Sequence, residues 1–146
     1  MKKIIGLTAI LFAMSSMTFA QEKDNNKQVN VPAVVTTALY KKYPDAKKVT
    51  WEKEDGNYEA NWGGKSGEDN SVQFTPSGTF IEIVNAIPVS SLPQPVIVYV
   101  SGHYKGSKIT EVGKVTDAAG KTSYEAEVKG KDVIFGEQGN FIKSEK

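Results

Sequence analysis

The residues with the clearest capacity for chemistry are carboxylates that recur at alternating positions. Glu52 and Glu59 fall in two neighbouring segments of alternating polarity, and Glu125 and Glu127 fall in another near the far end of the chain. Because successive side chains of a strand point to opposite faces, this spacing predicts carboxylates aligned on one face of a sheet. Together with Gln73 from the segment 71–75, these residues form the candidate partner-binding set.

Such a row could bind a cation or a basic peptide, or two of its carboxyls could form an acid–base pair in a small hydrolase. A simpler interpretation needs no ligand, because glutamates are common on solvated strands and Lys53 and Lys129 lie nearby to neutralise them. We therefore expect the polar face to be solvated. A non-catalytic binding module is the leading hypothesis, and the alternatives are the hydrolase and a structural or stress-related envelope protein.

Three other features indicate no catalytic, cofactor or metal site. Residues 64–66 (Gly-Lys-Ser) resemble the end of a phosphate loop, but Glu59 stands where that motif requires its first glycine. We expect a flexible hairpin loop over 63–70. Residues 68–70 (Glu-Asp-Asn) lack the alternating oxygen spacing of a calcium loop. His103, the single histidine, has no Ser and carboxylate placed beside it by any pattern, so we expect it to face solvent near a helix end.

One ten-residue pattern occurs twice, at 72–81 and 133–142. Val, Phe, Gly, Phe and Ile recur at identical places, each displaced by 61 positions. Each copy predicts a β-hairpin, in which Gly78 or Gly139 supplies the positive φ that a tight turn requires.

The pattern around these hairpins predicts an α+β fold made of two tandem units, each a helix followed by four antiparallel strands. Apolar residues at helical spacing predict a helix over 32–43, with Asn30 as its cap. The run 96–100 is β-branched and alone would indicate a strand, but the displacement by 61 favours a second helix there. The strands are predicted over 49–54, 58–62, 71–75, 78–84, 109–117, 122–129, 131–135 and 139–143.

One face of the predicted strands is apolar and should form the core under the helices. Its members are Val49, Trp51, Tyr58, Ala60, Trp62, Val72 and Phe74 in the first unit, and Tyr124, Ala126, Val128, Val133 and Phe135 in the second.

The first twenty residues read as a signal peptide, with lysines, an apolar run and a small-x-small cleavage site. We expect a flexible leader over 21–29 and a single domain over 30–146, with units at 30–90 and 91–146. The protein should be periplasmic or secreted, without stable membrane insertion after cleavage. Removal of two lysines leaves 16 basic residues against 17 acidic ones, which disfavours nucleic-acid binding.

Several motifs together resemble a known family. They are the Val-Pro-x-x-Val-x-x-x-Leu-x-x-x-Tyr-Pro-x-Ala run over 31–46, the Val-x-Trp strand at 49–51 and the two Phe-x-x-x-Gly-x-Phe hairpins. The chain is similar to the PepSY-like, β-lactamase-inhibitor-like exported proteins of Bacteroidetes. That resemblance implies tandem α-β4 units with the helices on one face of an antiparallel sheet. It also implies an inhibitor-like module that uses its sheet surface or its loops to recognise a protein or peptide of the cell envelope.

Overall fold

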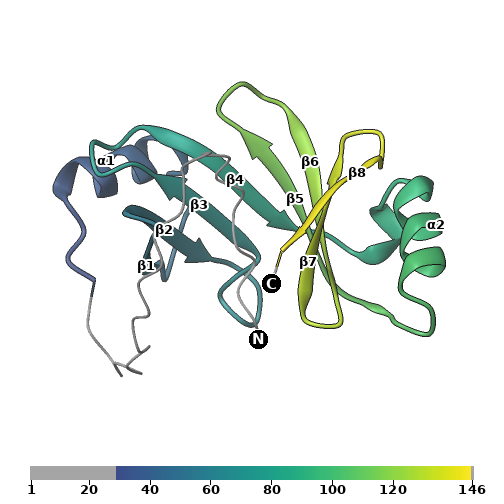
Figure 1. Ribbon diagram of the computed structural model, residues 1–146. Helices are drawn as coiled ribbons and strands as arrows, with labels where there is room; N and C mark the ends of the chain where they lie inside the picture. The colour runs from purple at the N-terminus through teal and green to yellow at the C-terminus, as the bar shows by residue number, and fades with distance from the viewer. Residues whose placement is uncertain (1–28, 146) are drawn as a thin grey trace, which may run out of the picture.

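The computed structural model describes residues 29–145, so the predicted signal peptide and most of the predicted leader lie outside the described residues. Its element order is helix, four strands, helix, four strands (Figure 1). The helices are α1 (Ala33–Lys42) and α2 (Gln94–His103), and the 3-10 helix η1 (Val89–Ser91) precedes α2. The strands are β1 (Thr50–Glu54), β2 (Asn57–Trp62), β3 (Asn70–Phe74), β4 (Phe80–Ala86), β5 (Ile109–Asp117), β6 (Thr122–Val128), β7 (Lys131–Gly136) and β8 (Phe141–Glu145).

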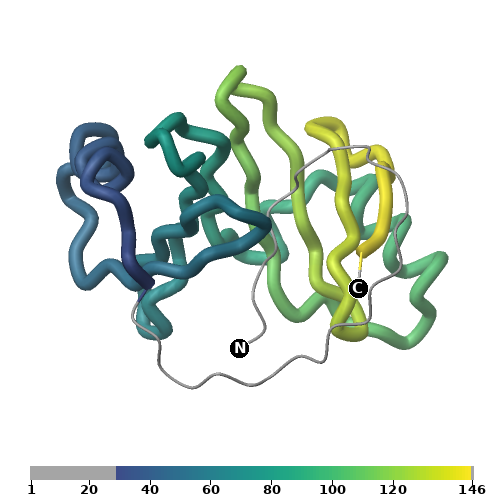
Figure 2. Tube along the Cα trace, turned by 60° about the vertical axis from the view of Figure 1, so that its left-hand side comes forward, coloured from purple at the N-terminus to yellow at the C-terminus, as the bar shows by residue number. Residues whose placement is uncertain are grey.

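All eight strands form one open antiparallel sheet in the order β1 to β8, each strand pairing with the next along the chain. The α+β class is therefore as predicted. The helices lie at opposite ends of this sheet, and the strands of the second half run at a steep angle to those of the first (Figures 1 and 2). Such twist is the ordinary consequence of strand chirality.

Strand register places both helices on the same face. Directly opposed residues share a face, and the face that carries Ala60 continues through Ile83 and Thr116 to Ala126. Val35 and Leu39 of α1 pack on its first half. The buried valines of α2 pack on its second half. The predicted apolar face is thus the helix-covered face.

The core confirms most of the predicted members and corrects four of them, because Val49, Trp51, Trp62 and Tyr124 are only partly buried. Phe74 is 1% exposed and Phe135 is 0% exposed, so the repeated hairpin pattern supplies the largest buried side chains of both halves. Trp51 and Trp62 are only half-buried and pack against the edge of the core. Their position explains this, because β1 is an edge strand and Trp62 ends β2.

Helix α1 begins without the predicted cap. Its N-cap is Pro32, which makes no side-chain hydrogen bond, and Asn30 lies two residues earlier. The Pro32 carbonyl accepts hydrogen bonds from the N–H groups of Val35 (2.9 Å) and Thr36 (3.2 Å). Because the proline ring already fixes φ at −57°, the chain enters the helix without a polar cap.

Helix α2 confirms that tertiary packing overrides β-branched propensity at 96–100. Val96 and Val100 lie one helical turn apart and are 0% and 3% exposed in the core. The helix ends where the Tyr104 N–H donates to the Val100 carbonyl at 2.8 Å. In a strand, Val98 would share one face with Val96 and Val100. In the helix it is 60% exposed while the two valines are buried, so tertiary packing outweighs the local propensity.

The two predicted glycine turns hold the hairpins against the helices. Gly78 and Gly139 have φ of 82° and 83°, as predicted. A Cβ on Gly78 would lie 2.9 Å from the carbonyl oxygen of Val34, and one on Gly139 would lie 3.1 Å from the Cβ of Pro95. Glycine is therefore required twice over, for its left-handed conformation and for the close approach of the turn to the helix start.

Candidate binding surface

The face of the sheet opposite the helices, called here the open face, carries the candidate residues. Glu52 of β1 opposes Glu59 of β2, Glu59 opposes Gln73 of β3, and Gln73 opposes Glu82 of β4. The predicted alignment of Glu52, Glu59 and Gln73 is therefore correct. Glu82 in turn opposes Asp117 of β5, so this acidic row crosses from the first half of the sheet into the second.

The open face continues across the second half. Glu125 of β6 opposes Ile134 of β7, and Glu127 opposes Asp132, which itself opposes Glu145 of β8. The structure thus brings Glu125 and Glu127 to the same face as the candidates of the first half. That face is one surface that spans all eight strands.

The prediction of a solvated polar face is wrong. Glu59, Gln73 and Glu125 are only 5%, 4% and 2% exposed, and Glu82 and Asp132 are also buried. Directly across the neighbouring strands, Glu59 lies between Glu52 and Gln73, whereas Glu125 lies between Ile134 and Gly113, which has no side chain. The other two candidates, Glu52 and Glu127, are half-buried.

Glu59 is fully engaged by neighbouring amides. Its two carboxylate oxygens accept hydrogen bonds from Asn61 Nδ2 at 3.0 Å and from Gln73 Nε2 at 3.3 Å. Gln73 Nε2 also lies 3.3 Å from a carboxylate oxygen of Glu54. Burial of this carboxylate is therefore compensated by the charge-assisted bonds that it needs.

Glu125 has different surroundings. Neither of its carboxyl oxygens has a hydrogen-bond partner. Burial, followed by the negative charges of Glu82, Asp132, Glu145 and Glu59, raises the pKa of Glu125 well above the ordinary glutamate value. Both causes disfavour the ionised form, so this carboxyl holds its proton to higher pH than a solvated glutamate.

Asp132 is a second acid of this kind. Burial and then the charges of Glu127, Glu145 and Glu111 raise the pKa of Asp132. The predicted neutralisation by Lys53 does not occur, because its ammonium lies 5.5 Å from the ring of Tyr58 on the helix-covered face. Among the described strand residues, Lys143 is the one lysine on the open face, and it is paired with Glu145. The open face is therefore strongly acidic.

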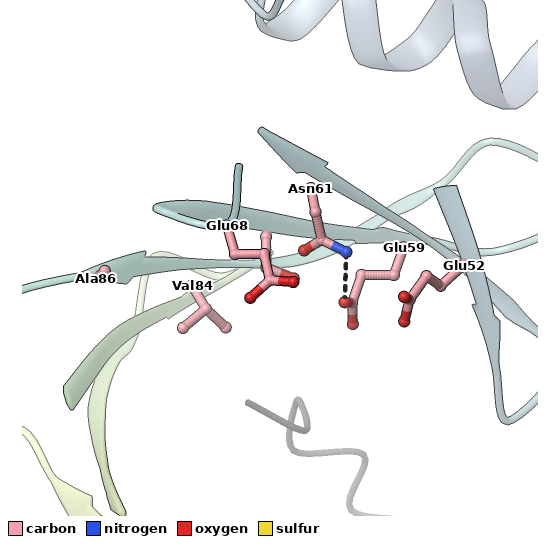
Figure 3. A pocket seen from close by; sticks show the side chains of 7 residues that line it. Glu52, Glu59, Asn61, Glu68, Val84 and Ala86 are labelled. Atoms are coloured by element: carbon pink, nitrogen blue, oxygen red, sulfur yellow. Dashed lines mark hydrogen bonds between the residues drawn. The ribbon is translucent and has the colours of Figure 1, made fainter. Parts of the chain in front are cut away.

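Apolar side chains lie between the acids at the centre of the sheet. Val84, Val115 and Ile134 are 4%, 2% and 0% exposed and all belong to the open face. A small hollow of about 30 Å³ opens beside Val84, with Glu52, Glu59 and Glu68 pointing into it (Figure 3). A hollow of this size holds about one or two waters and no partner side chain.

The other sequence motifs lie away from this surface or form no site. Residues 64–66 are exposed in the connection from β2 to β3, as a hairpin loop should be. His103 is exposed at the end of α2, as predicted. Its ring stacks on Tyr99 at 3.9 Å between centroids, and its Nδ1 donates to the Tyr99 carbonyl at 2.9 Å. In the part of the chain that the structure describes, no three metal-ligating side chains come together, and no helix is long and apolar enough to span a membrane.

Sequence reasoning missed five acids of the open face: Glu82, Glu111, Asp117, Asp132 and Glu145. Glu82 and Asp132 sit in apolar strand segments, Ile-Glu-Ile-Val and Asp-Val-Ile-Phe. This pattern could have revealed them. Successive side chains of a strand point to opposite faces, so a single carboxylate among apolar residues should lie on the face away from the core. Glu145 lies near the chain end and carries no comparable signal.

Comparison with known proteins agrees with this architecture. The family model described as "Putative beta-lactamase-inhibitor-like, PepSY-like" matches residues 63–143. This match covers more than half of the chain, and the chain belongs to this family, as the sequence motifs predicted. No curated protein sequence matches the chain.

Solved structures from Bacteroides share the fold at low sequence identity. A "putative periplasmic" protein of Bacteroides eggerthii aligns with a TM-score of 0.70 at 19% identity, covering 80% of this chain and 89% of that one. A DUF2874 family protein of Bacteroides uniformis gives 0.68 at 23% identity, covering 78% and 88%. A BLIP-like protein of Bacteroides fragilis gives 0.61 at 21% identity, covering 80% and 86%. The protein therefore has a BLIP-like α+β fold.

Proposed function

We propose that this protein is a non-catalytic exported module that recognises a basic segment of another envelope or secreted protein through its open face. The observation that carries the proposal is that the open face bears acidic side chains in both halves of the sheet. Lys143 is the one lysine of this face among the described strand residues. A surface with one sign of charge attracts partners of the opposite sign and raises their encounter rate.

Recognition suits this surface better than the hydrolase alternative does. Catalysis requires acid and base groups that are held in position and reach a substrate. Glu59 is occupied by Asn61 and Gln73, and no hydrogen bond holds either carboxyl oxygen of Glu125 in position. Binding partners tolerate side-chain rotations at an interface much better than a catalytic centre does.

The two halves of the surface support a tandem origin for the fold. The bounds of α1 and α2 are displaced by 61 positions, as are the glycine turns at Gly78 and Gly139. We infer that both halves descend from one α-β4 unit, at 30–90 and 91–146. A single extended partner could then contact both halves at related positions.

An exported location is consistent with this function. Lysines, an apolar run and a small-x-small site make 1–20 a signal peptide in this proposal, and the Bacteroides eggerthii relative is described as periplasmic. The partner would then be a protein or peptide of the envelope, and no nucleic acid.

The test uses a defined cationic probe. Acetylated, amidated tetralysine should bind the protein with an affinity that falls as salt rises, and tetraglutamate should not bind. Glu52→Gln and Glu127→Gln together should weaken tetralysine binding several-fold. Glu137→Gln, an exposed change in the turn from β7 to β8, is the matched control and should leave binding unchanged. Equal weakening by the control, or no binding of tetralysine to the wild type, would contradict the proposal.

A further inference from the structure

Glu125 occupies the centre of the second half of the open face without a hydrogen-bond partner for either carboxyl oxygen. It is 2% exposed. Buried polar groups in folded proteins are almost always hydrogen bonded, so an exception of this kind needs a specific reason. The equivalent residue in the first half, Glu59, is satisfied by two amides.

The charged groups that face Glu125 from every neighbouring strand are nearly all acidic. Lys143, the exception, is already paired with Glu145 on the same strand. The other acids that surround it on the open face are Glu59 on β2, Glu82 on β4, Glu111 on β5, Glu127 on β6 and Asp132 on β7. The surroundings therefore favour a cation next to Glu125, and among the described strand residues the one lysine of this face is already paired with Glu145.

We propose that Glu125 is the receptor for one cationic side chain of the basic partner, and that binding exchanges the proton of Glu125 for that cation. This inference rests on the proposed function of the open face. In the free protein the Glu125 carboxyl stays protonated between the ordinary glutamate pKa and its own raised pKa. When an ammonium group arrives, the carboxyl O–H bond breaks, the proton passes to solvent, and the carboxylate accepts hydrogen bonds from the ammonium.

The neighbouring residues suit a lysine side chain. Ile134 lies directly opposite Glu125, and Val115 lies on the adjacent strand of the same face. These apolar groups can hold the methylene stem of a lysine while its ammonium reaches the carboxyl. Both helices pack on the other face, so the partner must approach Glu125 from the open face.

Calorimetry measures the exchange directly. Tetralysine is titrated into the protein at about pH 5.5, roughly one unit above the ordinary glutamate pKa. The titration is repeated in buffers of different ionisation enthalpy, so that the dependence of the observed heat on the buffer counts the protons released. The wild type should release about one proton more than Glu125→Gln, by linkage between proton and cation binding. Asp132 is present in both proteins, so the difference belongs to Glu125.

A matched control and a second readout complete the experiment. Glu137→Gln removes an exposed carboxyl in the turn from β7 to β8 and should leave the proton count at the wild-type value. At about pH 7 we expect Glu125→Gln to bind tetralysine roughly tenfold more weakly, the size typical of a hydrogen bond to a charged group. Carboxyl carbon NMR of the wild type should show one raised glutamate titration that moves to lower pH when tetralysine is added, and this readout needs no variant.

The outcomes separate this inference from the proposed function. If tetralysine binds the wild type without releasing more protons than Glu125→Gln, the exchange is wrong while the acidic surface stands. If the raised titration is unmoved by saturating tetralysine, Glu125 is not the receptor. Absence of any tetralysine binding to the wild type would overturn the proposed function, and this inference with it.

Discussion

The triplet Tyr-Glu-Ala occurs in both halves of the sheet, and its two glutamates behave differently. Glu59 and Glu125 lie on β2 and β6, at the second and third strands from opposite edges, and both point to the open face. Around Glu59, Asn61 and Gln73 provide amide donors. The corresponding positions around Glu125 hold Glu127 and Ile134, which donate nothing.

A shared local motif therefore does not determine the chemistry of a buried carboxyl. The backbone position and the burial are alike, with 5% and 2% exposure. The neighbours differ: Asn61 is replaced by Glu127 two positions along the strand, and Gln73 by Ile134 on the following strand. On the preceding strand, Glu52 opposes Glu59 and Gly113 opposes Glu125. A carboxylate that accepts two amide bonds is stable when ionised, whereas one among other carboxylates and apolar groups favours its neutral form.

The largest expected effect tests whether the helix-covered cores of the two halves are energetically alike. Phe74→Ala and Phe135→Ala should each lower the free energy of unfolding by about 3–5 kcal/mol, because each empties a fully buried aromatic site. Chemical denaturation measures the loss. Trp51→Ala should cost clearly less, since Trp51 is half-buried. A loss near zero at either phenylalanine would show that this half does not depend on its hairpin.

The next prediction gives opposite signs at the paired glutamates. Glu59→Met should destabilise the protein by about 1–3 kcal/mol, because the Asn61 amide loses its buried acceptor. Glu125→Met should raise stability by about 1 kcal/mol or more at neutral pH, since it replaces an unpartnered acid beside Ile134 with an apolar group. Urea unfolding of both variants at the same pH measures the two changes in the free energy of unfolding. Changes of the same sign would show that the two glutamates do not differ in their effect on stability.

The pH dependence of stability should carry the same distinction. Burial and neighbouring charge raise the pKa of Glu125, so between the ordinary glutamate pKa and the raised one the folded state binds more protons than the unfolded chain. The free energy of unfolding should therefore fall as pH rises through this window, by about 1.4 kcal/mol for each unit by which the pKa is raised. Asp132 contributes with the same sign.

Glu125→Gln isolates the contribution of Glu125 to this slope. The variant should show a flatter fall than the wild type, and the exposed-site control Glu137→Gln should not. Denaturation midpoints between about pH 4.5 and 8 provide the measurement. If Glu125→Gln keeps the wild-type dependence of stability on pH, that dependence comes from other groups.

A smaller difference is expected between the two glycine turns. Alanine at Gly78 or Gly139 takes on a left-handed conformation that costs about 1–2 kcal/mol. The added Cβ at position 78 meets the backbone carbonyl of Val34 at 2.9 Å, whereas at 139 it meets the Cβ of Pro95 at 3.1 Å. We expect Gly78→Ala to be the more destabilising of the two in thermal unfolding, because backbone yields less than side-chain contacts do.

Most of the fold could be predicted from the sequence because repetition supplied information that local propensity lacks. The run 96–100 would have been assigned to a strand without its equivalent at 35–39, and the structure makes it part of α2. Hairpin glycines and alternating apolar residues fixed the strands to within a few residues. The cap at Asn30 failed because Pro32 starts the helix unaided.

The candidate surface was only partly predictable. Alternation placed Glu52, Glu59 and Glu125 on one face correctly. Burial could not be read from it, because exposure depends on which long side chains lie on the neighbouring strands. The contrast between Glu59 and Glu125 depends on cross-strand partners, Gln73 and Ile134, and no pattern within a single strand reveals these.

The smallest effect on stability is expected at Glu52 and Glu127, the two half-buried glutamates of the candidate set on the open face. Glu52 and Glu127 are both half-buried, and one lies in each half of the sheet. Replacing either with Lys should change the free energy of unfolding by about 0.5 kcal/mol or less, as at surface sites. The same replacement at the buried Glu59 or Glu125 should cost much more. Each reversal should still slow association with tetralysine several-fold at low salt, because rim charges act mainly on the encounter rate.

Stopped-flow association rates at low and moderate salt provide the measurement. The effect should shrink as salt screens it. If both halves take part in recognition, the two reversals should slow association comparably, and the double variant should slow it further. A rate that depends on Glu127 alone would restrict the binding surface to the second half, where Glu125 lies. Unchanged rates in two folded variants would instead move the interface away from the open face.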